Sequence, residues 1–152
     1  MAHSLNLTLP IKQDPETLKK LQELKAAFAT EIQPAMDKAL RESKIVHFAR
    51  VVVIHDKFLQ VITEYDGDPK EYTEFFRVAL PDVFGALFSL AEGAPKFGDL
   101  DELSFFRLAQ SLDLPGLGES EQGFKDLSGQ DKGYLFSAYR DMTVKQNLPK
   151  LK

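Results

Sequence analysis

The sequence predicts an α+β domain in which two long helices cover one face of a four-stranded antiparallel sheet. Two apolar runs typical of strands lead into an Asp-Pro pair, at residues 14–15 and 68–69, and each pair opens a stretch of helical apolar spacing. Another strand-like run precedes the second of these units, and one more lies near the end of the chain. The predicted order is therefore strand, helix, strand, strand, helix, strand.

The first unit begins with a half-buried strand over residues 4–11. Polar residues alternate there with Leu5, Leu7, Leu9 and Ile11. Asp14 is placed to cap a helix, and Pro15 occupies the first helical position, where its missing N–H costs nothing. Apolar residues at helical spacing continue to about residue 43. Pro34 is expected to kink or restart this helix, because proline cannot donate to the carbonyl four residues back.

A hairpin is predicted next, because residues 45–54 and 58–65 are rich in β-branched and aromatic residues and only three residues separate them. Its register stays open. A three-residue loop pairs Ile54 with Phe58 and sets Arg50 opposite Ile62, with Glu64 diagonal to it. A two-residue loop shifts every pair by one.

The second unit repeats the first. Asp68 caps a helix with Pro69 at its first position and Glu71 placed for a capping box, and Pro81 interrupts the helical pattern that follows. The last strand is predicted at 134–144. Residues 94–133 form an insertion, with a short helix at 100–112 capped by Asp99 and then a loop rich in Gly, Ser and charge. The whole chain, 1–152, reads as one domain.

This order of elements resembles the ferredoxin-like superfold, in particular the dimeric α+β barrel proteins. The resemblance covers residues 4–93 and 134–144 and rests on topology. It implies that two sheets pack face to face across a twofold axis and that small ligands bind between sheet and helices. Relatives of this kind include enzymes, ligand-binding proteins and haem-binding proteins.

The pattern of residues 45–54 supports a homodimer independently. An antiparallel sheet with helices on one side only should alternate apolar and polar residues, yet both sides of this strand are mainly apolar. Another subunit or the 94–133 segment is expected to cover the second face, and we favour the subunit.

Composition excludes several classes of function. The net charge of −4 argues against a nucleic-acid partner, since phosphate binding needs a basic surface. No apolar run is long enough to span a membrane, and the first residues lack the features of a signal peptide, so we expect a cytoplasmic protein. The absence of cysteine excludes disulfides and thiolate metal sites, and the three histidines show no metal-ligand spacing.

Two polar residues interrupt the apolar strand and are the first candidates for a site. His47 and Arg50 are three residues apart, and this odd spacing places their side chains on opposite faces of a strand. His47 is either a general base or ligand donor oriented by Tyr65 or Asp66, or a structural histidine bonded across the hairpin. Arg50 either binds a carboxylate or haem propionate, or forms an ion pair with Glu64 or with a partner subunit.

Further candidates come from the helices and the last strand. Phe76 and its aromatic neighbours either line a pocket or fill the core, and Arg140 either faces the same cavity as Arg50 or pairs at an interface. The segment TEYDG (63–67) is similar to the GxxDG motif of dye-decolourising peroxidases, although Thr63 replaces its first glycine.

The function predicted from these residues is small-molecule binding between sheet and helices. The alternative is a module for self-association or protein docking, and a haem-binding, peroxidase-like protein is the less favoured alternative. No catalytic residue or cofactor is assigned. The ligand-binding candidates are His47, Arg50, Glu64, Tyr65, Phe76 and Arg140.

Overall fold

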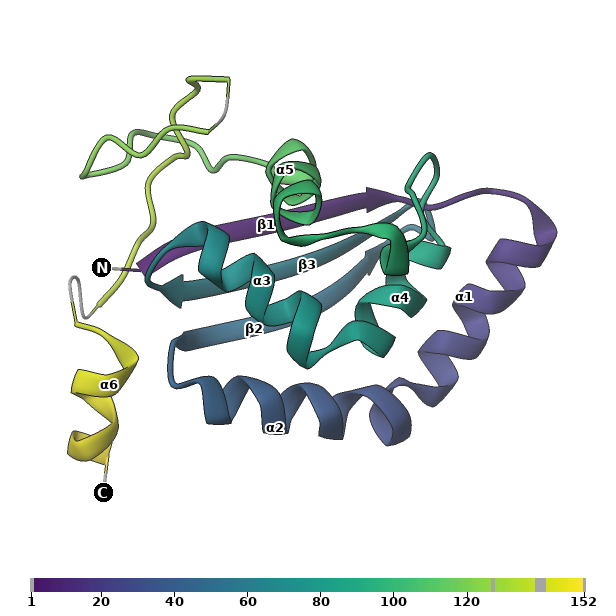
Figure 1. The fold of residues 1–152 in the computed structure, drawn as a ribbon, viewed down its shortest axis with the longest axis horizontal. Coiled ribbons are helices and arrows are strands. Elements are labelled where there is room, and N and C mark those ends of the chain that lie inside the picture. Colours follow the sequence, from purple (N-terminus) through teal and green to yellow (C-terminus); the bar gives the residue numbers. More distant parts are fainter. Residues whose placement is uncertain (1, 127, 139–141, 152) are drawn as a thin grey trace.

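The computed structural model describes residues 2–126, 128–138 and 142–151 and contains a three-stranded antiparallel sheet. The strands are β1 (Ala2–Pro10), β2 (Val46–Ile54) and β3 (Phe58–Asp66), in the order β1-β3-β2. Because β1 and β2 both run antiparallel to the central β3, they are parallel to each other (Figure 1). The first five predicted elements are all present in the predicted order.

The prediction of a fourth strand at 134–144 is wrong. Residues 134–138, 142 and 143 form no strand, residues 139–141 lie outside the described part, and the chain then forms α6 (Val144–Asn147) and the 3-10 helix η3 (Leu148–Leu151). At the outer edge of β1, the Leu114 N–H donates to the Asn6 carbonyl at 3.0 Å and the Asn6 N–H donates to Asp113 at 2.8 Å. The insertion thus satisfies backbone groups of Asn6 at the outer edge of β1, and the fold is only partly ferredoxin-like.

The first helical region is divided as Pro34 predicts. It consists of α1 (Pro15–Ala27), the π-helix η1 (Phe28–Ile32) and α2 (Gln33–Ser43). Pro34 lies in the first turn of α2, where no N–H is needed, and the wider π-helical turn precedes it. At the start of α1, the Asp14 carboxylate accepts the Thr17 N–H at 2.9 Å, which confirms the predicted cap.

The second helical region is α3 (Pro69–Ala79) and α4 (Pro81–Ser89). Asp68 caps α3 as predicted, but in the described structure Glu71 does not complete the predicted capping box. The 3-10 helix η2 (Phe97–Asp99) and α5 (Glu102–Leu112) follow. The predicted cap of α5 is wrong by two residues. Asp99 lies inside η2, and Asp101 caps α5 through a reciprocal capping box with Ser104.

The core lies between one face of the sheet and the helices. Alternate residues of β1 and β3 on this face are buried, and α3, α4 and α5 lie over them (Figure 1). An aromatic cluster made of Phe76, Phe84, Phe88, Phe97 and Phe105 fills the space between these elements. Phe97 and Phe105 belong to the predicted insertion, which therefore contributes to the main core.

Among the described residues, no helix covers the other face of the sheet, and we call it the open face. Strand β2 presents there the residues that alternate with the helix-facing Val51 and Val53. Phe48 is 74% exposed on the open face. The full set on β2 and β3 is Phe48, Arg50, Val52, Ile54, Phe58, Gln60, Ile62 and Glu64.

Candidate functional site

The hairpin register decides which side chains meet on the open face. Ile54 pairs with Phe58 and Arg50 pairs with Ile62, which is the register of a three-residue loop. His55 and Asp56 both take positive φ angles at the turn.

A β-bulge at His47 changes the face to which this residue belongs. Val46 pairs with Tyr65 while Phe48 pairs with Glu64, so β2 has one residue more than β3 at this point. The strict alternation of faces is lost there. The prediction of opposite faces assumed strict alternation, which the bulge removes at His47, and His47 and Arg50 line the same cleft.

This cleft has a volume of about 470 Å³ and lies on the open face, near the ends of β2 and β3. Its floor includes Phe48, Ile62 and Glu64, and its other wall is the segment 135–138 with Ala2. Three predicted site residues, His47, Arg50 and Glu64, thus come together. They do so on the side of the sheet away from the helices, not between sheet and helices.

His47 is fixed by Asp66, at the end of β3. Nε2 of His47 lies 2.8 Å from Oδ1 of Asp66, and the two side chains are 18% and 11% exposed. When the imidazole is neutral, a proton on Nε2 donates to the carboxylate and leaves Nδ1 as an acceptor. The second carboxylate oxygen, Oδ2, accepts the backbone N–H of Val144 at 2.8 Å. Asp66 therefore orients His47 and also holds the start of α6.

Both carboxylate oxygens of Asp66 are hydrogen-bonded, which argues against the role that the similarity to dye-decolourising peroxidases implies. A distal aspartate that serves haem chemistry must face the cofactor, whereas this carboxylate is occupied by His47 and the Val144 N–H. The residues around Asp66 do not fit that role.

Arg50 and Glu64 lie on one cleft without forming an ion pair. Within the described residues, the side chain of Arg50 makes no hydrogen bond, and neither Arg50 nor Glu64 has a charged partner within 4.0 Å. Burial raises the pKa of Glu64, and the nearby charges of Arg50 and His47 offset part of that rise. The Arg50 guanidinium and the Glu64 carboxylate thus lie in one cleft and attract each other without direct contact.

The remaining candidates lie elsewhere. Tyr65 and Phe76 are 2% and 1% exposed in the core on the helix side. Tyr65 stacks on Tyr72 with 3.8 Å between ring centroids, and burial raises its pKa. Arg140 lies outside the described residues.

On the helix side, a hollow of about 450 Å³ lies between α2 and α3, and none of the predicted site residues lines it. A smaller hollow of about 220 Å³ lies between α1–η1 and the hairpin and also contains none of the predicted site residues. Its lining is Leu24, Lys25, Phe28, Val51, Val53 and Leu59.

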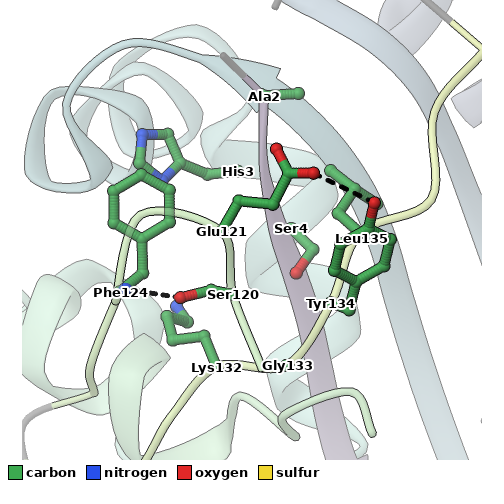
Figure 2. Close-up of a pocket in the computed structure, with 10 residues that line it drawn as sticks. All are labelled: Ala2, His3, Ser4, Ser120, Glu121, Phe124, Lys132, Gly133, Tyr134 and Leu135. Carbon is green, nitrogen blue, oxygen red and sulfur yellow. Dashed lines mark hydrogen bonds between the residues drawn. The ribbon is translucent and has the colours of Figure 1, made fainter. Parts of the chain in front are cut away.

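A second hollow, beside the start of β1, is shown in Figure 2. The ring of His3 lies between Phe124 and Tyr65, at centroid distances of 4.4 and 5.5 Å. The Tyr134 hydroxyl donates to Glu121 at 3.1 Å across the same loops (Figure 2). The space is about 30 Å³, roughly enough for one water molecule. These contacts pack the insertion against β1 and leave no room for a larger ligand.

Replacing Glu64 by glutamine is expected to raise the melting temperature at pH 7. The folded state raises the pKa of Glu64 above 4.5, so burying its charge lowers stability above that range, and this loss disappears as the pH falls below about 4. Glutamine stays neutral throughout. Thermal unfolding at both pH values checks this, with the exposed Glu23→Gln as control. An E64Q melting temperature equal to or below that of the parent at pH 7 would contradict it.

Comparisons with protein-family models, curated proteins and solved structures give no significant match. Among the described residues, no helix combines the length and apolar character needed to cross a membrane.

Proposed function

We propose that the cleft on the open face binds a small molecule. The observation that carries this proposal is the convergence of His47, Arg50 and Glu64, which supply an imidazole, a guanidinium and a carboxylate, on one concave surface. Phe48 and Ile62 give the same surface an apolar part. Ligand sites typically combine apolar walls with a few polar groups in this way.

The electrostatics of the cleft support this proposal. A structural Arg–Glu pair on adjacent strands would gain from direct contact, yet Arg50 and Glu64 form no ion pair in the described structure. Instead Glu64 remains half-buried at a cost in stability. Groups held apart in a cleft remain available to a ligand.

Native mass spectrometry of freshly purified protein tests the proposal. We expect the parent to retain an added mass that Arg50→Ala loses, while the ligand-free forms of both unfold at the same temperature because Arg50 is exposed. Lys57→Ala is the matched control, since Lys57 is an exposed cation on the same hairpin and, in the described part of the chain, only its backbone makes hydrogen bonds. Absence of any added mass in the parent, or equal retention in R50A, would contradict a site at Arg50.

Self-association is the second candidate, and the exposed apolar side chains of the open face favour it. Phe48 is 74% and Phe58 43% exposed, and apolar surface of this kind favours burial against a partner. A second copy is the partner that fits best. A twofold interface brings one patch against itself, and this patch carries both a cation, Arg50, and an anion, Glu64, so it is complementary to its own copy.

Sedimentation equilibrium checks this second candidate. We expect the parent to sediment as a dimer and Phe48→Asp as a monomer, because a charge buried in an apolar interface is unfavourable. Val78→Asp introduces the same charge at a residue that is 65% exposed on α3, away from the open face, and should leave the dimer intact. A monomeric parent, or equal dissociation of both variants, would contradict a dimer formed through the open face.

A further inference from the structure

We infer that the ligand of the cleft is a zwitterion with an apolar body, such as an apolar α-amino acid. This inference rests on the proposed binding function and specifies its chemistry.

The spacing of the two charged residues is the first argument. Arg50 pairs with Ile62, two residues along β3 from Glu64, so the two residues are diagonal neighbours on one face of the hairpin. The Cα atoms of diagonal neighbours on antiparallel strands are about 7–8 Å apart. With no ion pair between the described side chains, a group carrying both a carboxylate and an ammonium fits between them. The Arg50 guanidinium would bind the carboxylate with two parallel N–H donors, and Glu64 would accept from the ammonium.

His47 supplies the second argument, because it favours a primary ammonium. Asp66 engages Nε2 of His47, which leaves Nδ1 as the acceptor of the neutral ring. Together with Glu64, the cleft then offers two acceptors for the three N–H donors of a primary ammonium. A quaternary ammonium would leave both acceptors without a donor.

The apolar part of the cleft is the third argument. Phe48 lies directly opposite Glu64 and Ile62 directly opposite Arg50, so an apolar side chain is adjacent to each charge. Leu135 and Phe136 contribute apolar groups from the other wall. The volume of about 470 Å³ lies within the range of small-molecule sites, and it accommodates an aromatic amino acid. An apolar body beside a zwitterionic head group matches this arrangement.

Isothermal titration calorimetry of the full chain with four probes tests the inference. The probes are L-phenylalanine, 3-phenylpropionate without the ammonium, phenethylamine without the carboxylate, and L-serine without the apolar body. We expect L-phenylalanine to bind at least about tenfold more tightly than each of the others, since each lost contact removes a charge-assisted hydrogen bond or buried apolar surface. Arg50→Gln should reduce the affinity for L-phenylalanine to about that for phenethylamine, and Glu64→Gln to about that for 3-phenylpropionate. Lys57→Gln should change nothing.

The outcomes separate this inference from the function on which it rests. Equal affinities for L-phenylalanine and 3-phenylpropionate, both lost in R50Q, would overturn the zwitterion and leave an anion site. Failure of all four probes to bind would also overturn the zwitterion, while a mass retained by the parent and lost in R50A would still support a site of different chemistry. Failure of the probes together with no retained mass would overturn both. Circular dichroism of each variant shows whether it is folded.

Discussion

Replacing Lys132 by methionine is expected to lower the free energy of unfolding by about 3–5 kcal/mol, the range for removing one partner of a buried ion pair. Nζ of Lys132 lies 2.7 Å from Oδ2 of Asp113, and their side chains are only 12% and 4% exposed. Asp113 also accepts the Asn6 N–H at the outer edge of β1. Without Lys132, this buried carboxylate has no charged partner within 4.0 Å in the described structure.

Urea denaturation measures this effect. Lys125→Met is the matched control, because the Lys125–Asp131 pair is longer, at 3.8 Å, and Lys125 is 57% exposed. Its loss should cost no more than about 1 kcal/mol, as for exposed pairs. The double variant K132M/D113N should regain part of the loss, since it removes both charges. Equal effects of K132M and K125M would show that burial of the Lys132–Asp113 pair is unimportant.

Replacing Phe84 by alanine is expected to cost about 3–5 kcal/mol, the range for truncating a buried phenylalanine. Phe84 is 1% exposed, and its ring centroid lies 4.8 Å from Phe76 and 6.0 Å from Phe105. These rings come from α4, α3 and α5, so the cavity left by F84A would loosen the contact between the predicted insertion and the rest of the core.

Chemical denaturation of F84A, followed by circular dichroism, provides the measurement. Val78→Ala is the control on the neighbouring helix α3, where a side chain that is 65% exposed should contribute within about 0.5 kcal/mol. A small loss in F84A, comparable to that in V78A, would mean that the aromatic cluster is not a close-packed part of the core.

The elements that the sequence predicts correctly are those determined by nearby residues. Asp14 and Asp68 accept backbone N–H groups within three residues of themselves, so the start of each long helix can be recognised locally. Prolines 34 and 81 divide the helices for an equally local reason. The strand at 134–144 was predicted wrongly because apolar alternation does not say whether a partner strand is free. In the structure, residues 113–114 contact the outer edge of β1.

The candidate site was predicted in part for a similar reason. Polar residues within an apolar strand drew attention to His47 and Arg50, but their convergence depends on the bulge at His47, which changes the register by one residue. No local pattern reveals such a bulge. Tyr65 and Phe76 have the same spacing whether they line a pocket or fill the core. The wall at 135–138 could not be found, because it reaches the cleft only through tertiary folding.

The carboxylate of Asp66 contacts both His47 in the cleft and the backbone of Val144, and it therefore couples the cleft to the C-terminal residues. Oδ1 of Asp66 contacts the His47 imidazole and Oδ2 accepts the Val144 N–H, so a change in the position of the ring alters the anchor of α6. The two interactions are thermodynamically linked, and the linkage is reciprocal. The exchange rate of the Val144 amide hydrogen should therefore change if a ligand binds beside His47, and shortening the chain before residue 144 should in turn change the affinity for that ligand.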